Sequence, residues 1–255
     1  MVIGHLKYIF KVLFLLVLFN FTYSLFAANL ESDYRDAVVL FEKRDVVSCE
    51  ASIAVLEKIL EQKTDSLDAQ ALIAYAYAHH GGMLQQINGS GGEYLNSAYA
   101  FAKAALSQQP TNIYARKAIL LLKLIGGDIV DVRKQVEKEW SEKETDADIW
   151  YFRAVSGDAA AATKSLQEAL RKNTSHVWIY SDMAFRALLA NDFATAEKWI
   201  AALQKQQAEI ADVDLLKAVL AIKRSDEKEA RLAWDSFTRK APESVIVDAY
   251  KKLKK

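Results

Sequence analysis

The sequence predicts an all-α protein, a right-handed α-solenoid of about six helix–turn–helix hairpins. Apolar residues recur at helical spacing after Glu31, and no alternation typical of strands is present. Only 9 Gly and 2 Pro leave few of the turns that a sandwich or barrel needs. In the second half, a pair of residues that ends in Asp recurs every 34 residues. The three pairs are Gly157-Asp158, Asn191-Asp192 and Ser225-Asp226. A fixed step of this length is typical of stacked hairpins that bury their apolar faces against one another.

The N-terminal segment differs from the rest of the chain. Lys7 and Lys11 precede an apolar run, and small residues end it at Ala27 and Ala28. This order predicts a secretory signal peptide over residues 1–27, and hence a periplasmic or secreted protein. The alternative is a retained inner-membrane anchor over residues 12–28, which is at the lower limit for crossing a bilayer. A membrane is expected as a partner only through this segment.

Composition excludes some partners. The 33 basic and 33 acidic residues cancel, so we expect no nucleic acid to bind. The single cysteine, Cys49, cannot form an internal disulfide, and its apolar neighbours predict a buried position.

The repeat domain is predicted over residues 28–255. In the first hairpin, 32–43 pairs with 48–62, whose inward stripe contains Leu56, Ile59 and Leu60. In the second, 66–80 pairs with 94–108 across an inserted glycine-rich loop at 81–93. After Pro110, 112–124 pairs with 129–143.

The last three hairpins follow the 34-residue step. Their helices are predicted over 146–156 and 158–172, 177–190 and 192–206, and 211–223 and 226–240. A lysine-rich capping helix over 244–255 ends the array, because a repeat protein needs a polar end.

The pattern resembles the tetratricopeptide repeat (TPR). A Gly-Asp-like turn joins helix A to helix B, and a small residue follows early in helix B at Ala162, Ala196 and Ala230. Both prolines, Pro110 and Pro242, fall at the end of a repeat. The helix A signature is degenerate, and its spacing slips to 33 between Phe152 and Phe185. The resemblance implies that A helices line a concave groove that binds proteins or peptides.

Six residues on predicted A helices are candidates for partner binding, because aromatic side chains supply rigid contact area. They are Tyr114, Lys117, Tyr151, Trp178, Ser181 and Phe185. The alternative is that they pack between repeats. The loop at 81–93 is a candidate binding lip through Met83, Leu84 and Ile87, or else a tolerated insertion.

The sequence favours a non-catalytic scaffold, not an enzyme, with a protein or peptide partner and no cofactor. No Gly-x-Ser-x-Gly elbow is present, and His79 and His80 point about 100° apart on a helix, so no metal site is expected. The alternative is an accessory protein of solute uptake, similar in plan to the T component of TRAP transporters. A buried cluster of polar groups with shifted pKa values would favour an enzyme.

Overall fold

The computed structural model describes residues 29–140, 145–174 and 176–247. The predicted signal peptide at 1–27 and most of the capping helix at 244–255 lie outside the described residues, so both stay predictions. Within those described ranges, no helix is long and apolar enough to cross a membrane.

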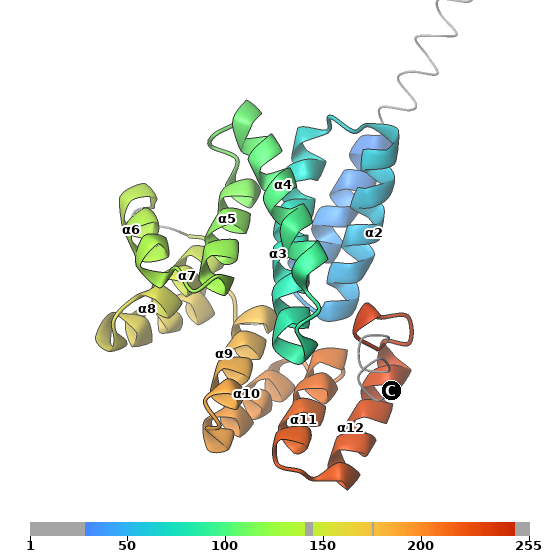
Figure 1. Ribbon diagram of the computed structural model, residues 1–255, viewed down its shortest axis with the longest axis vertical. Helices are drawn as coiled ribbons and strands as arrows, with labels where there is room; N and C mark the ends of the chain where they lie inside the picture. The colour runs from blue at the N-terminus through green and yellow to red at the C-terminus, as the bar shows by residue number, and fades with distance from the viewer. Residues whose placement is uncertain (1–28, 141–144, 175, 248–255) are drawn as a thin grey trace, which may run out of the picture.

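Six hairpins follow one another along the chain, as predicted, and the described residues are helical without strands (Figure 1). A helix over 29–42 pairs with α2 (Val46–Gln62). The other pairs are α3 (Leu67–Asn88) with α4 (Gly92–Gln108), α5 (Ile113–Ile125) with α6 (Ile129–Glu139), α7 (Ala147–Ser156) with α8 (Ala159–Lys172), α9 (Val177–Leu189) with α10 (Phe193–Gln206), and α11 (Ala211–Lys223) with α12 (Glu227–Lys240). The all-α array is confirmed.

The turns inside the hairpins explain the repeated residue-Asp pairs. At Asn191 and Ser225, φ is 57° and 59°, the left-handed conformation that ends a helix. The next residue, Asp192 or Asp226, then caps helix B, because its side chain accepts the backbone N–H three residues on. Such a cap stabilises a helix by about 1 kcal/mol. Gly127-Asp128 and Arg44-Asp45 form the same turn in earlier hairpins.

The prediction of an inserted loop at 81–93 is wrong. Helix α3 continues to Asn88, Gly89 ends it with φ of 76°, and α4 begins at Gly92. Gly81 and Gly91 serve close packing instead: a methyl group at Gly91 would collide with the backbone carbonyl of Gly81. Glycine is required here because two helix backbones meet without room for a side chain.

The predicted lip residues are therefore part of a helix. Met83 and Leu84 are 7% and 3% exposed and pack into the core of the last two hairpins, and Ile87 is partly buried against it. These turns of α3 join two parts of the core.

The last hairpin contacts the first. The N–H of Val46 donates to Asp212 Oδ2 at 3.0 Å, and Glu50 Oε1 accepts from the Ser244 hydroxyl at 2.9 Å and the Val245 N–H at 3.2 Å. In a regular solenoid each repeat contacts only its neighbours. Here the end of the array returns to the lower end of α2 (Figure 1), so the first and last hairpins lie together.

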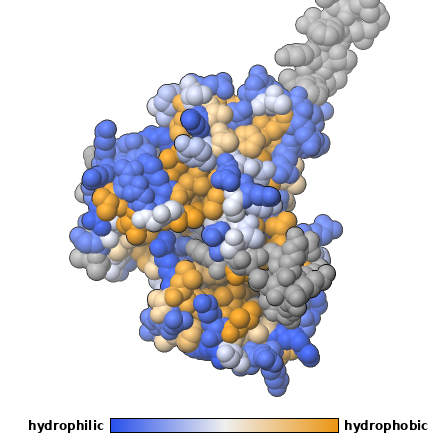
Figure 2. Space-filling model, viewed as in Figure 1, coloured by the Kyte–Doolittle hydropathy of each residue, from blue (hydrophilic) through white to orange (hydrophobic). Residues whose placement is uncertain are grey.

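Apolar side chains also reach the surface. Figure 2 shows them over α5 and over α9, bordered by polar residues. Single exposed apolar side chains include Leu189 at 57% and Leu232 at 55%. Isolated residues of this kind are normal on soluble domains and mark no site by themselves.

Candidate functional site

A buried carboxylate lies at the centre of the array. Asp148, in the first turn of α7, is 3% exposed. Its Oδ2 accepts from Lys117 Nζ at 2.8 Å and lies 3.2 Å from Arg44 Nη2. Its Oδ1 is 2.6 Å from His176 Nε2. Arg44 lies in the turn of the first hairpin, Lys117 lies on α5, and His176 immediately precedes α9. Together with Asp148 on α7, four hairpins therefore meet at one side chain.

The electrostatics favour the ionised form of Asp148. Burial alone would raise its pKa, but the guanidinium of Arg44 and the ammonium of Lys117 hold that pKa well below its ordinary range. Lys117 also pairs with Asp146 at 2.5 Å, and Arg44 pairs with Glu42 at 3.1 Å. The cluster therefore combines two buried cations with three carboxylates. A buried cation left without these partners would be costly, because desolvation disfavours charge.

Arg44 occupies an unusual backbone position. Its φ is 61°, whereas the corresponding turns use Gly127, Asn191 and Ser225, which are smaller. The left-handed conformation costs an ordinary L-residue roughly 1–2 kcal/mol. Its guanidinium carbon lies 4.7 Å from the Trp178 ring centroid and 4.6 Å from that of Phe41. The contacts of this side chain explain why an arginine is present at a strained position.

Aromatic rings enclose the ionic cluster. Trp178 is stacked on His79 with ring centroids 3.3 Å apart, and it meets Phe41 and Tyr75 edge to face. Burial, together with the nearby Arg44, holds the pKa of His79 well below its ordinary value. His79 is therefore neutral near pH 7, and this part of the site gains no further positive charge.

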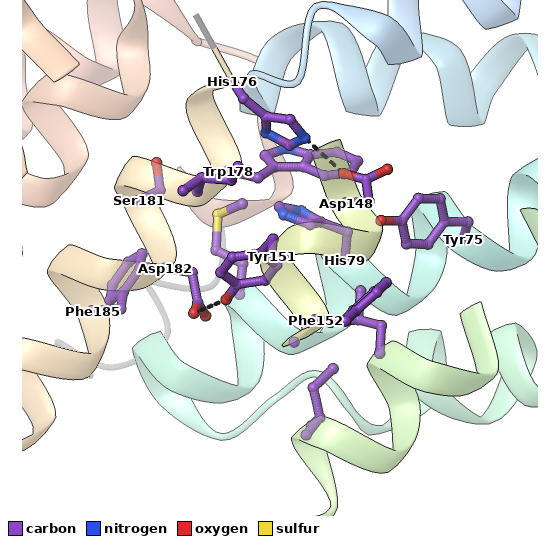
Figure 3. A pocket seen from close by; sticks show the side chains of 15 residues that line it. Tyr75, His79, Asp148, Tyr151, Phe152, His176, Trp178, Ser181, Asp182 and Phe185 are labelled. Atoms are coloured by element: carbon purple, nitrogen blue, oxygen red, sulfur yellow. Dashed lines mark hydrogen bonds and ion pairs between the residues drawn. The ribbon is translucent and has the colours of Figure 1, made fainter. Parts of the chain in front are cut away.

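A cavity of about 60 Å³ lies beside Trp178, between α3, α5, α7 and α9 (Figure 3). Its walls are mainly apolar and aromatic, with Asp148, His176, Ser181 and Asp182 among the polar residues. The Tyr151 hydroxyl donates to Asp182, which also pairs with Arg186 at 2.5 Å. Burial raises the pKa of Tyr151 well above its ordinary value, and the carboxylate of Asp182 adds to this shift.

A second, polar pocket of about 290 Å³ lies on the other side of the ionic cluster. It is lined by Glu42, Arg44, Tyr114, Lys117 and Lys172, with Asp146, Asp148 and His176. Asp148 and His176 line both pockets. They form the wall that separates an apolar cavity from a polar surface pocket.

Four polar atoms on the cavity residues have no protein hydrogen-bond partner: His79 Nδ1, Trp178 Nε1, Ser181 Oγ and His176 Nδ1. Trp178, Ser181 and His176 are 4%, 5% and 2% exposed. An unpaired buried polar group costs about 1–3 kcal/mol. A group that enters the cavity and pairs with these atoms would remove part of this cost.

The structure brings together the six partner-binding candidates from the A helices. Tyr114 and Lys117 line the polar pocket; Tyr151, Trp178, Ser181 and Phe185 line the cavity. They form no exposed strip, because five of the six are at most 9% exposed and Tyr114 is half-buried. The closed array turns the A helices inward, so these side chains surround pockets and do not line an open groove.

Sequence reasoning missed Arg44, Asp148, His79 and Asp182. One signal was present: Arg44-Asp45 repeats the turn chemistry of Asn191-Asp192 with an arginine in the left-handed position. Asp148 had no such signal, since an acid in the first turn of a helix is common. Asp182 had none either, because a single acid within a helix is usually an exposed residue.

The Asp148–His176 pair alone does not make a hydrolase. His176 immediately precedes α9 and Ser181 lies within it, and neither the Ser181 hydroxyl nor His176 Nδ1 has a hydrogen-bond partner, so the two side chains do not form a nucleophile–base pair. In a neutral imidazole, donation from Nε2 to Asp148 leaves Nδ1 as an acceptor. Across 29–140, 145–174 and 176–247, no group of three or more His, Cys, Asp or Glu is placed to hold a metal ion.

No family model and no curated protein matches the chain. Among solved structures, the chain is similar to YrrB, described as a TPR protein with an unusual peptide-binding site. The TM-score is 0.39 at 17% sequence identity, over 77% of this chain and 97% of YrrB.

Proposed function

We propose that the chain is a non-catalytic helical-repeat scaffold that binds a protein or peptide partner in the bacterial cell envelope. One observation carries this proposal: six residues from A helices converge on two pockets that share Asp148 and His176. Unpaired polar atoms in the cavity supply hydrogen bonds, and the polar pocket reaches the surface at Glu42 and Lys172.

Binding is favoured over catalysis by the pairing of charges. A general base or nucleophile must reach a substrate in reactive form. Here Asp148 is held by Arg44, Lys117 and His176, and Asp182 is held by Tyr151 and Arg186. A buried cluster with shifted pKa values would favour an enzyme, but these charges position helices and line a pocket.

Site-specific photo-crosslinking in the cells that make the protein tests this proposal. A benzoylphenylalanine at position 114, on the rim of the polar pocket, is expected to form a specific protein or peptide adduct. The matched control is the same residue at position 99 on α4, where Tyr99 is 55% exposed and lines neither pocket. Equal adducts at both positions, or none at 114, would contradict the proposal.

A second candidate function is an accessory role in solute uptake, as in the T component of TRAP transporters. The apolar cavity between hairpins favours it, because such a cavity suits a small molecule more than an extended peptide. A position-114 adduct with a solute-binding or transport protein would support this role over a general scaffold.

The proposed location has its own test. If residues 1–27 are a cleaved signal, the mature protein starts at Ala28 and is released with the periplasmic fraction or secreted. An intact N-terminus in the membrane fraction would favour the anchor over residues 12–28 instead.

A further inference from the structure

The charges around the cavity are already matched. Asp148 pairs with Arg44, Lys117 and His176, and Asp182 accepts from Tyr151 and pairs with Arg186. An entering cation would therefore find no unpaired carboxylate, and an entering anion would meet two carboxylates on the wall. Charged groups lose their water on entry and need such a partner.

The remaining polar groups are neutral or lack a partner. Trp178 Nε1 can only donate, and the Ser181 hydroxyl can donate or accept. His176 Nδ1 and His79 Nδ1 are two further unpaired atoms on residues that line the cavity. The other walls include Leu121, Ile125 and Phe152, which offer apolar contact only.

We propose that the cavity binds an uncharged group with an apolar body and a carbonyl or amide end, which accepts from Trp178 and pairs with Ser181. The proposal rests on the proposed function, since it names the chemistry of the group that a partner inserts. The cavity is small and not fully enclosed, so a partner can insert a single side chain or ring while the rest of the partner stays outside.

Three probes of similar size separate the possibilities: benzamide is neutral, benzoate is an anion and benzylamine is a cation near pH 7. Proton–nitrogen correlation spectra of the full mature chain report on its five tryptophan indoles, and the Trp178→Phe variant identifies the Trp178 signal. We expect benzamide to shift that signal at millimolar concentration, and benzoate and benzylamine to leave it unmoved.

Two conservative variants test the hydrogen bonds. Ser181→Ala should weaken benzamide binding about fivefold or more, the loss expected when one hydrogen bond is removed. Trp178→Phe keeps an aromatic ring but lacks the indole N–H, and it should also weaken benzamide binding. Because this variant has no Trp178 signal, its binding is measured by saturation transfer from the protein to benzamide. The control Ser107→Ala changes an exposed serine on α4 and should bind as the wild type does.

The melting temperatures of these variants make the test independent of folding. Removal of an unpaired hydroxyl at Ser181 should leave the melting temperature unchanged or raise it. The proposal predicts a Kd of about 1 mM for benzamide. If benzamide at about 10 mM leaves the Trp178 signal unshifted, the proposal is overturned. Stronger binding of benzoate or benzylamine, or equal binding by Ser181→Ala, would overturn it too. The crosslinking outcome at position 114 is independent, so a partner without benzamide binding would leave the proposed function standing.

Discussion

The contact between the first and last hairpins predicts that stability falls as the pH rises. Asp212 on α11 is 2% exposed and accepts the N–H of Val46, and the described residues place no cation in an ion pair with it. Burial, with the neighbouring carboxylates Asp45 and Glu50, raises the pKa of Asp212 from 3.8 to about 7. The folded chain therefore binds this proton more tightly than the unfolded chain does.

The magnitude follows from that pKa difference. The stabilisation is fully present below pH 4, where Asp212 is protonated in both states, and is lost as the pH rises to 7. Each pKa unit corresponds to about 1.4 kcal/mol, so the free energy of unfolding should fall by about 2–3 kcal/mol between pH 5 and pH 8 through this group alone.

The substitution Asp212→Asn removes the titration and keeps an oxygen that can accept from Val46. We expect its free energy of unfolding, from urea denaturation followed by circular dichroism, to fall about 2–3 kcal/mol less than that of the wild type over this range. At pH 8 the variant should be the more stable protein.

The matched control is Asp192→Asn, at an exposed helix cap. Hydrogen bonds from Thr195 lower the pKa of Asp192, so its substitution cannot reproduce a gain in stability at high pH. Parallel pH profiles for wild type and Asp212→Asn would refute the reasoning. They would mean that Asp212 is solvated or paired in the folded chain.

The remaining predictions concern backbone and packing. Arg44→Gly should lower the free energy of unfolding by about 2–3 kcal/mol in urea, since the lost cation of Asp148 outweighs the relieved backbone. Ser225→Gly, at the equivalent turn without a buried ion pair, should be neutral or stabilising, and a similar loss in both would contradict this account. Gly91→Ala should lower the melting temperature by several degrees because its methyl group meets the backbone of α3; an unchanged value would restore a flexible loop there. Ala196→Leu should cost about 1–3 kcal/mol, because Ala196 is fully buried between helices, and an unchanged melting temperature would count against the register.

The hairpin array could be predicted because its signals are local. Asn191-Asp192 and Ser225-Asp226 combine a left-handed turn residue with a helix cap, and both functions depend only on residues within one turn. Every helix of the last three hairpins was therefore predicted to within a few residues.

The segment 81–93 was misassigned for a physical reason. Five glycines in thirteen residues indicate a loop when only the local sequence is considered. Gly81 and Gly91 are instead needed because α3 and α4 cross closely, which is a contact between residues ten apart. A helix that tolerates glycine for packing has the same local composition as a flexible insertion.

The site could be predicted only in part. Trp178 and Phe185 were found because aromatics at helical spacing mark the inner face of an A helix. Their burial could not be predicted, because it depends on closure of the array. Asp212 and Glu50 make that closure with Val46 and Ser244, which lie 166 and 194 residues away from them in the sequence. Pairings at that separation leave no periodic signal in the sequence.

The ionic cluster is better understood as a device of position than of stability. A buried ion pair often contributes little net stability, because desolvation offsets its attraction. Arg44 adds a strained backbone to that cost, yet it reaches Asp148 across hairpins that are not adjacent in sequence. Val46, two residues after Arg44, makes the contact to Asp212 that closes the array. One short segment thus fixes both the closure and the wall between the two pockets, so a change that opened the closure would also displace Arg44 from Asp148. We infer that the strain at Arg44 is retained because the pockets form only when the first hairpin is held in this place.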